Sequence, residues 1–152
     1  MLSNGKDQAM KLWDVRRMSA TPSATLGAQP RRHWDYRMEY YPNSRFRSGR
    51  GTVPPPTPVD GDMSVMTYHG HRVLRTLIRC YFSPQATTGQ RYVYTGSHDG
   101  SCYIYDVLSG ELVDTLHGHQ GVLRDVSWHP TLPTLITSSW DKSIAVWEHT
   151  RV

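Results

Sequence analysis

The sequence repeats a pattern of residues at a spacing of 42, and this repeat limits the folds that are open to the chain. A shift by that spacing makes three kinds of residue coincide, a serine, an aspartate and an aromatic residue: Ser97 with Ser139, Asp99 with Asp141, and Tyr105 with Trp147. A Gly-His pair precedes each copy, at Gly70-His71 and at Gly118-His119. A shortened third copy opens the chain, where Asp7 stands six residues before Trp13. Such self-similarity predicts one structural unit that is used several times.

A repeat of about 40 to 45 residues with Gly-His early and Trp-Asp late resembles the WD40 repeat, in which each unit builds a four-stranded blade of a β-propeller. The resemblance implies an all-β fold, a partial WD40 β-propeller of two blades and part of a third. We expect residues 1–16 to be the end of one blade, 17–62 a largely disordered Pro/Arg-rich insertion between strands, 63–116 the remaining blade strands, and 117–152 a last blade without its outer strand. Because a closed propeller needs about four to eight blades, we expect a fragment of a longer protein.

In that family a buried chain of hydrogen bonds holds each blade together. The indole of a tryptophan donates to a serine hydroxyl, the hydroxyl meets a histidine ring, and the ring meets an aspartate, so that every buried polar group has a partner. The resemblance assigns this role to the following residues: Asp7 and Trp13 in the first blade, His71, Ser97, Asp99 and Tyr105 in the middle blade, and His119, Ser139 (or Ser138), Asp141 and Trp147 in the last blade. Because Tyr105 replaces the tryptophan, we expect a weaker network in the middle blade.

The same residue types could suggest other chemistry. Serine, histidine and aspartate form hydrolase triads, but a nucleophilic serine needs exposure and an oxyanion site, whereas these residues should be locked inside a blade. His69-Gly-His71 and His117-Gly-His119 look like metal-binding pairs. One histidine of each pair is assigned to the blade network, which leaves too few ligands for a closed zinc site. We predict no catalytic residue, no cofactor and no metal.

Trp13-Asp14-Val15-Arg16 is more specific than the repeat itself. It resembles the WDxR box of the WD40 substrate receptors of cullin-4 ubiquitin ligases, which docks the propeller on the ligase's damage-specific DNA-binding adaptor. The later stretches MTYHGHRVLRTLIRCYFSP, RDVSWHP and SSWDKSIAVW extend a similarity to the eleventh cullin-4 associated factor and its plant embryo-abundant relatives over nearly the whole chain. The resemblance implies that Trp13, Asp14 and Arg16 form the adaptor-binding site, with the Arg16 guanidinium free to fork onto the adaptor.

The function implied by this resemblance is a non-enzymatic scaffold. It would act as a substrate receptor, bind the ligase adaptor and an unknown substrate protein, and present that substrate for ubiquitin conjugation and proteasomal degradation in the nucleus and cytoplasm. A general WD40 platform for protein interactions without ligase attachment is the first alternative. RNA binding through the insertion is the second.

The insertion carries the whole charge excess of the chain. From Arg17 to Gly61, seven arginines face Asp35, Glu39 and Asp60, which accounts for the net charge of +4. Arginines that alternate with aromatic residues are suited to pairing with phosphates and stacking on bases. The candidate nucleic-acid contacts are Arg31, Arg32, Trp34, Arg37, Arg45, Arg47 and Arg50. We favour the simpler interpretation, in which the aromatics pin the insertion to the propeller surface and the arginines are solvated.

The two cysteines and the lack of apolar runs bear on the compartment. Cys80 and Cys102 fall on the inner and third strands of one predicted blade, which are not neighbours, so we expect free buried thiols in a reducing compartment. The sequence has no apolar run of about 18 residues and no basic-then-apolar leader, so we expect an intracellular chain with no membrane partner.

Overall fold

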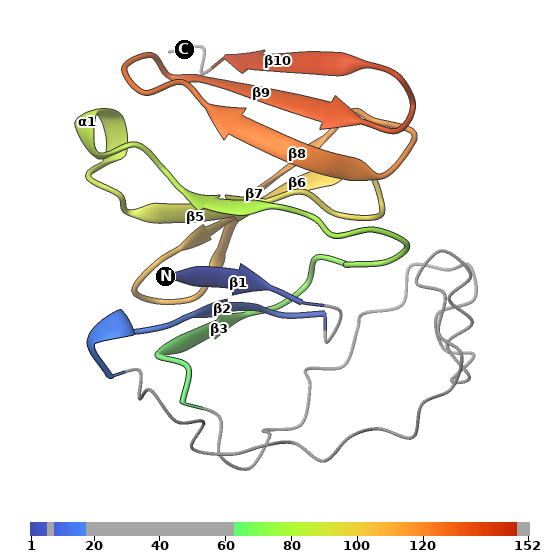
Figure 1. Ribbon diagram of the computed structural model, residues 1–152. Coiled ribbons are helices and arrows are strands. Elements are labelled where there is room, and N and C mark those ends of the chain that lie inside the picture. Colours follow the sequence, from blue (N-terminus) through green and yellow to red (C-terminus); the bar gives the residue numbers. More distant parts are fainter. Residues whose placement is uncertain (6–7, 18–62, 149–152) are drawn as a thin grey trace, which may run out of the picture.

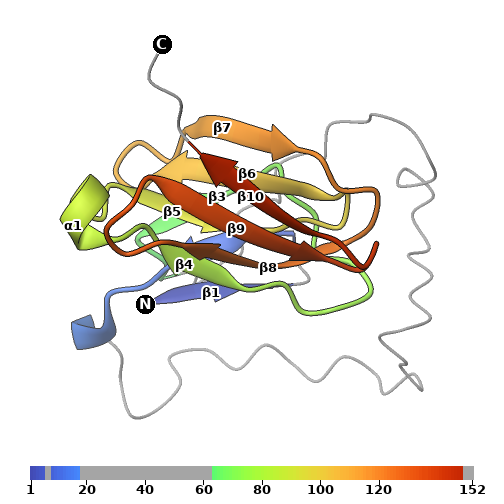
Figure 2. The ribbon, with the colours of Figure 1, turned by 90° about the horizontal axis from the view of Figure 1, so that it is seen from above.

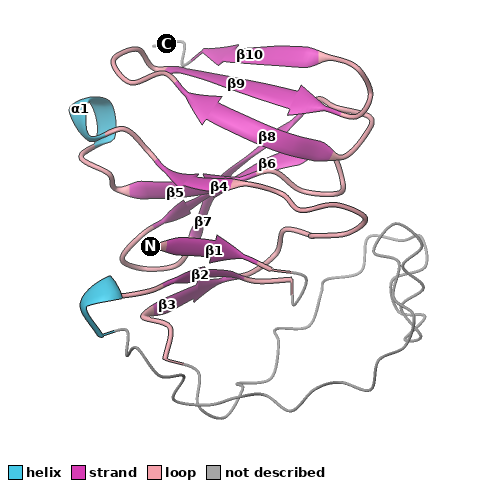
Figure 3. Ribbon diagram, viewed as in Figure 1, coloured by secondary structure: helices cyan, strands magenta, loops and turns pink. Residues whose placement is uncertain are grey.

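The computed structural model describes residues 1–5, 8–17 and 63–148, whose strands form three stacked antiparallel sheets (Figure 1). The first sheet holds β1 (Leu2–Asn4), β2 (Met10–Leu12) and β3 (Met66–Tyr68), the middle sheet holds β4 (Cys80–Phe82), β5 (Tyr92–Thr95), β6 (Ser101–Asp106) and β7 (Leu112–His117), and the last sheet holds β8 (Leu123–Trp128), β9 (Thr134–Ser139) and β10 (Ile144–Glu148). The described residues add only a 3-10 turn, η1 (Val15–Arg17), and one short helix, α1 (Gln85–Thr88) (Figure 3). The predicted all-β fold, part of a propeller, is confirmed.

Strand order shows how the sheets are joined. In the first sheet β2 pairs with β3, with Met10 opposite Tyr68, so residues 18–62 connect two neighbouring strands of one sheet. In the middle and last sheets the strands follow one another in chain order. Seen from above, the sheets lie over one another with their strands crossing at an angle (Figure 2). This stacking gives each neighbouring pair of sheets its own hydrophobic core.

The first core lies between the first and middle sheets. Met10 and Tyr68 from the first sheet are fully buried against Val93 and Tyr105 from the middle sheet. Tyr68 and Tyr105 meet with their ring centroids 5.6 Å apart. Burying side chains of this size contributes about 1.5 to 3 kcal/mol each. The short strands of the first sheet are therefore held mainly by their contacts with the middle sheet.

The second core lies between the middle and last sheets, and the alternation along β9 shows why. Leu135 is buried against Tyr94 and Ile104, and Thr137 on the same face is fully buried. Ile136 between them is 42% exposed, because successive strand residues point to opposite faces. One face of the last sheet thus packs on the middle sheet, and the other faces solvent.

The turn before β2, β6 and β10, the equivalent strands of the three sheets, has the same backbone form. Gln8, Gly100 and Lys142 each stand five residues before the aromatic residue of their repeat, and each has a positive φ, of 65°, 85° and 70°. A Cβ atom on Gly100 would lie 2.5 Å from the His119 carbonyl oxygen. Only glycine therefore allows the last sheet to approach the middle sheet this closely.

Two predicted elements differ from the structure. The strand signal in the sequence predicts a strand over residues 73–82, but β4 begins only at Cys80, because Val73 and Ile78 leave the ladder and bury their side chains with Val122 in a third small cluster. The sequence also predicts a simple turn over residues 84–90, and this segment contains α1, which ends at Gly89 in the left-handed region with φ 62°. The first change occurs where the middle sheet meets its neighbours, and the second occurs in the loop that connects β4 to β5.

The two cysteines are free thiols on strands that β5 separates. Cys102 is buried as predicted, and Cys80 is only partly buried. Burial raises the pKa of the Cys80 thiol to about 11 and that of Cys102 to about 12, so both stay protonated at neutral pH. Within the described residues, no helix is long and apolar enough to cross a membrane.

Candidate functional site

An aspartate–arginine pair occupies the end of β2. Arg16 Nε and Nη2 donate to the two carboxylate oxygens of Asp14, each at 3.0 Å, and the Arg16 backbone N–H donates to Asp14 Oδ1 at 3.0 Å. Asp14 raises the pKa of Arg16 above its ordinary value. The Arg16 side chain is 87% exposed and that of Asp14 only 23%. The carboxylate therefore anchors a guanidinium that faces solvent.

This geometry corrects the expectation that the Arg16 fork is free. Two of its five N–H groups are already bonded to Asp14, and three are left for a partner. Trp13, the third member of the sequence motif, donates its indole N–H to Ser3 Oγ at 2.7 Å. The Lys11 ammonium lies 6.0 Å from the centroid of the Trp13 ring. Trp13 thus fixes the end of β2, and Arg16 is the member of the motif that reaches outward.

The last sheet contains a hydrogen-bond chain whose hydroxyl is not the predicted one. Trp147 Nε1 donates to Thr137 Oγ1 at 2.9 Å, and Thr137 Oγ1 lies 2.8 Å from His119 Nε2. His119 Nδ1 lies 3.2 Å from Asp141 Oδ2 and 2.8 Å from Ser143 Oγ. Ser139 Oγ instead accepts the Asp141 backbone N–H at 3.3 Å. The assignment of Ser139, or Ser138, to this chain is therefore wrong.

Strand register explains the correction. Trp147 lies directly opposite Leu135, so Thr137 is its diagonal neighbour across the pair, whereas Ser139 lies a further two residues along, at the turn. The signal was present in the sequence as a hydroxyl ten residues before each aromatic residue: Ser3 before Trp13, Thr95 before Tyr105 and Thr137 before Trp147.

The donors and acceptors of this chain fix its proton positions. Asp141 can only accept, and Ser143 Oγ gives its own proton to Asp141, so the ring proton of His119 sits on Nδ1, facing both. His119 Nε2 then accepts from Thr137 Oγ1, which itself accepts the Trp147 indole N–H. Hydrogen bonds from Ser143, the Gln120 backbone and His119 hold the pKa of Asp141 below its usual range. Thr137 is fully buried, so its hydroxyl is not accessible to a substrate, unlike the exposed serine of a hydrolase triad.

The middle sheet has a different network. His71 Nδ1 lies 3.2 Å from the Tyr105 hydroxyl, and His71 Nε2 lies 2.9 Å from Asn4 Oδ1 of the first sheet. Asp99 does not reach His71, because its carboxylate accepts the Tyr103 hydroxyl at 2.9 Å and the Ser101 backbone N–H at 3.0 Å. The structure therefore brings together His71 and Tyr105 of the four residues predicted for this blade.

Ser97 is the fourth of them, and it accepts the Arg72 backbone N–H at 3.0 Å rather than joining His71. Physically, a tyrosine hydroxyl reaches the histidine ring directly, with no serine between them. Burial lowers the pKa of His71 to about 4, which keeps the ring neutral between its two partners.

Two side-chain contacts between the first and middle sheets were not predicted. Asn4 Nδ2 donates to Thr95 Oγ1 at 2.9 Å and to the Ile78 carbonyl at 3.2 Å. Gln8 Nε2 donates to the Val73 carbonyl at 3.1 Å, and the Val73 N–H donates back to Gln8 Oε1 at 2.9 Å. Sequence gave no signal for them, because a single amide residue in a turn has no visible partner.

Several predicted residues lie outside the described part of the chain. These are Asp7 of the first blade and the candidate nucleic-acid contacts Arg31, Arg32, Trp34, Arg37, Arg45, Arg47 and Arg50. Among the described residues, no group of three histidine, cysteine or acidic side chains could hold a metal ion. Of the predicted metal-like pairs, His117 bonds to Ser101 Oγ at 2.8 Å and His119 to Thr137.

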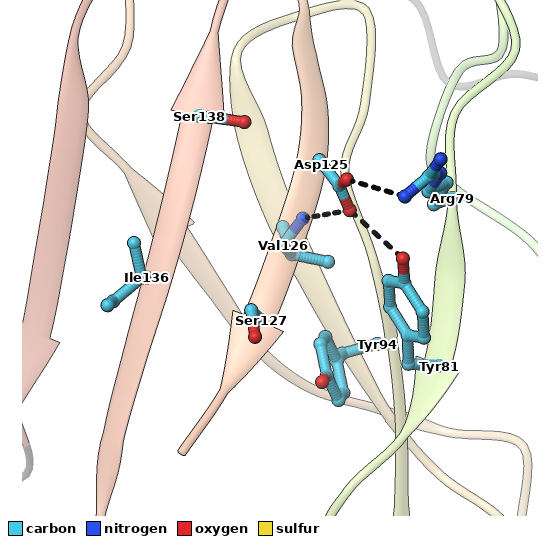
Figure 4. A pocket seen from close by; sticks show the side chains of 8 residues that line it. All are labelled: Arg79, Tyr81, Tyr94, Asp125, Val126, Ser127, Ile136 and Ser138. Atoms are coloured by element: carbon cyan, nitrogen blue, oxygen red, sulfur yellow. Dashed lines mark hydrogen bonds and ion pairs between the residues drawn. The ribbon is translucent and has the colours of Figure 1, made fainter.

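A cavity of about 410 Å³ opens beside β8, lined by residues of the middle sheet and by the solvent-facing side of the last sheet (Figure 4). Asp125 of β8 lines this cavity, and its carboxylate accepts hydrogen bonds from Arg79 Nη1 at 3.1 Å and from the Tyr81 hydroxyl at 3.2 Å. Ile136 and Ser138 line its far side. Arg79 stands where the next repeat has Asp125, and the two opposite charges tie the first strands of neighbouring sheets together. The pair is a structural link, because each charge already has its partner.

The chain belongs to the WD40 repeat family, since the WD domain, G-beta repeat, matches residues 63–106 and 110–148. Each matched repeat begins with the outer strand of one sheet and continues through the first three strands of the next, which interlocks the sheets.

The similarity to named relatives covers nearly the whole chain. It is 49% identical to the LEC14B protein of Lithospermum erythrorhizon over 148 residues, which are 97% of this chain and 29% of that protein. It is 50% identical to the LEC14B homolog of Prunus armeniaca over 148 residues, again 97% of this chain and 29% of that protein. It is 42% identical to the DDB1- and CUL4-associated factor 11 homolog of Caenorhabditis elegans over 149 residues, 97% of this chain and 24% of that protein. The chain thus spans less than a third of these relatives, and the resemblance found in the sequence is confirmed.

Proposed function

We propose that this chain is part of a non-catalytic substrate receptor that docks on the DDB1 adaptor of a cullin-4 ubiquitin ligase. The observation that carries the proposal is the exposed Arg16 guanidinium, held by two bonds to Asp14 at the end of β2. A relative that shares 42% of its residues over 97% of this chain is named as a DDB1- and CUL4-associated factor. The substrate protein would be captured elsewhere on the receptor and passed on for ubiquitin conjugation and degradation.

The geometry of Arg16 suits a docking contact for two reasons. Asp14 fixes the orientation of the guanidinium plane before any partner arrives, so less side-chain freedom is lost on binding. The remaining N–H groups point to solvent in a fixed fork, which matches a carboxylate or a pair of carbonyl oxygens. In the middle sheet Leu108 stands in place of the motif arginine, so the complete sequence motif occurs in the first sheet, where we propose the docking contact.

Binding to purified DDB1, measured by calorimetry with the whole chain, tests this proposal. Arg16→Ala should weaken binding by roughly thirtyfold or more, the usual effect of removing one partner from a buried interfacial charge pair. Arg16→Lys should recover little, because an ammonium cannot keep both bonds to Asp14 and a fork for the partner. Arg124→Ala is the matched control, an exposed arginine near the start of β8 at the other end of the sheets.

Folding must be checked in the same samples. The Arg16–Asp14 pair is on the surface, so its loss should leave the melting temperature close to that of the wild type. A folded Arg16→Ala chain that binds DDB1 as tightly as the wild type would overturn the proposal. A general WD40 interaction platform would then be the better description.

A further inference from the structure

A second aspartate–guanidinium pair stands at the repeat position equivalent to Asp14. Asp106 follows Tyr105 as Asp14 follows Trp13, and Arg91 Nε donates to Asp106 Oδ2 at 2.9 Å. The Arg91 side chain is 67% exposed and that of Asp106 only 13%. We propose that Arg91, with the exposed Leu108 beside it, forms a second contact for the DDB1 adaptor on the same face as Arg16. This inference rests on the proposed function and extends its site to the middle sheet.

The middle sheet builds its pair by a different route. Leu108 occupies the place of the motif arginine, and the guanidinium comes instead from the residue that precedes β5. The Val107 N–H donates to the Arg91 carbonyl at 2.9 Å, which ties the two segments together. The Arg91 guanidinium also lies over the Tyr92 ring, 5.5 Å from its centroid. A search for the sequence motif alone misses this pair, because its two members are 15 residues apart.

Asp106 is built to hold this guanidinium. Its Oδ1 accepts the backbone N–H groups of Leu108 at 2.9 Å and Ser109 at 3.0 Å, which leaves Oδ2 for Arg91. These bonds lower the pKa of Asp106 to about 2, so the carboxylate stays charged at neutral pH. Because the turn is closed by backbone bonds, it remains in place when Arg91 is removed.

Both pairs lie at the same end of the sheets. The Tyr68 hydroxyl donates to the Val107 carbonyl at 3.0 Å, and a Cβ on Gly110 would lie 3.0 Å from Met66 Sδ, so the 107–110 turn packs on β3. β3 in turn pairs with β2, whose end leads into Asp14 and η1. Figures 1 and 2 both show η1, which contains Arg16, and α1, which ends three residues before Arg91, at the left end of the stack. The proposed partner would therefore meet both pairs by binding at this end of the stack.

The side chains of this surface suit a partner that offers hydrogen-bond acceptors beside an apolar patch. Arg91 uses one of its five N–H groups on Asp106, and four are available to a partner. Leu108 is 85% exposed and Val15 next to Arg16 is 56% exposed, so each guanidinium has an apolar neighbour. Arginine is enriched among the residues that dominate protein interfaces, and the apolar side chain beside each one can exclude water from the contact. Since each arginine is balanced by its own aspartate, the partner needs carbonyl or carboxylate oxygens rather than a large negative charge.

The test uses calorimetry with purified DDB1 and the whole chain carrying Arg91→Ala or Leu108→Asp. Each variant should bind about tenfold more weakly than the wild type, with an unchanged melting temperature, because both side chains are exposed. Arg91→Lys should recover only part of the loss, and Arg124→Ala should match the wild type. In the double variant with Arg16→Ala, the two fold-changes should multiply, because the sites lie on different sheets.

The outcomes separate this inference from the proposed function. If Arg16→Ala weakens binding while folded Arg91→Ala and Leu108→Asp bind like the wild type, the second contact is wrong and the first stands. If the wild-type chain does not bind DDB1, or if Arg16→Ala has no effect, the proposed function itself fails, and the second contact fails with it.

Discussion

Replacing Thr137 by valine tests the buried hydrogen-bond chain of the last sheet. Valine keeps the shape of threonine and removes only its hydroxyl, which bonds to both Trp147 and His119. The substitution leaves the Trp147 indole N–H without an acceptor and His119 Nε2 without a donor. Thr137 is fully buried, so water cannot easily replace the lost group.

The expected loss follows from these two groups. An unsatisfied buried donor or acceptor costs about 1 to 3 kcal/mol, and Trp147 is only partly buried, so we expect the free energy of unfolding to fall by about 3 kcal/mol. Ser139→Ala should cost at most about 1 kcal/mol, because Ser139 Oγ accepts one long bond, 3.3 Å from the Asp141 N–H. Thr137→Ser is the matched control, since it keeps the hydroxyl and should cost less than Thr137→Val.

Urea unfolding followed by tryptophan fluorescence measures all three variants. The slope of free energy against urea should stay constant, so that a shift in midpoint reports stability alone. The reasoning is refuted if Ser139→Ala destabilises the chain as much as Thr137→Val does. That result would return the serine to the place in the network that the sequence suggested.

Three further predictions concern pH and the contacts between sheets. Burial lowers the pKa of His71 from 6.5 to about 4, so the unfolded chain binds a proton at a higher pH than the folded chain does. The free energy of unfolding, measured by urea titration, should therefore fall by roughly 3 kcal/mol as the pH drops between these two values. His71→Gln should not show this fall. Because the pKa of Asp141 is lowered, its contribution is complete above pH 4 and should be lost in more acidic solution, and thermal melts of Asp141→Asn should show a smaller acid dependence. Gln8→Ala removes both hydrogen bonds to the Val73 backbone and should lower the free energy of unfolding in urea by about 2 kcal/mol. Lys142 stands at the equivalent turn position of the last sheet but is exposed, so Lys142→Ala should lower it little.

The sequence predicts the sheets better than it predicts the contacts between them. Alternation and turn residues predict strands over residues 101–106 and 135–139, which match the bounds of β6 and come within one residue of those of β9, because both signals are local. β4 is shorter than predicted, because the first half of the predicted strand buries Val73 and Ile78 in a neighbouring cluster. Tertiary burial there outweighs the preference of the segment for a strand.

The candidate site shows the same division. Asp14 and Arg16 are two residues apart, so their pairing is visible in the sequence. Arg91 and Asp106 become neighbours only through the pairing of β5 with β6, and nothing in either local sequence announces it. The middle network is likewise completed by Asn4 from another sheet, which a prediction confined to one repeat cannot include.

The two junctions between sheets use opposite means at equivalent positions of the repeat. Nine residues before the aromatic residue, Asn4 bonds across to the middle sheet, whereas Gly96 lies so close to the last sheet that a Cβ would be 2.3 Å from the Leu123 carbonyl oxygen. Five residues before it, Gln8 holds the Val73 backbone, whereas Gly100 again allows direct backbone approach. Side-chain amides thus join the first pair of sheets, and close backbone packing joins the second.

Because of this difference, the residues at each junction suit only that junction. An asparagine in place of Gly96 would clash with the last sheet, and a glycine in place of Asn4 would leave His71 without an acceptor, so neither sheet can take the other's position. The spacing between Asp14 and Asp106 is therefore set by contacts that only this pair of sheets can make. A partner that contacted both guanidiniums, as we propose, would depend on that spacing.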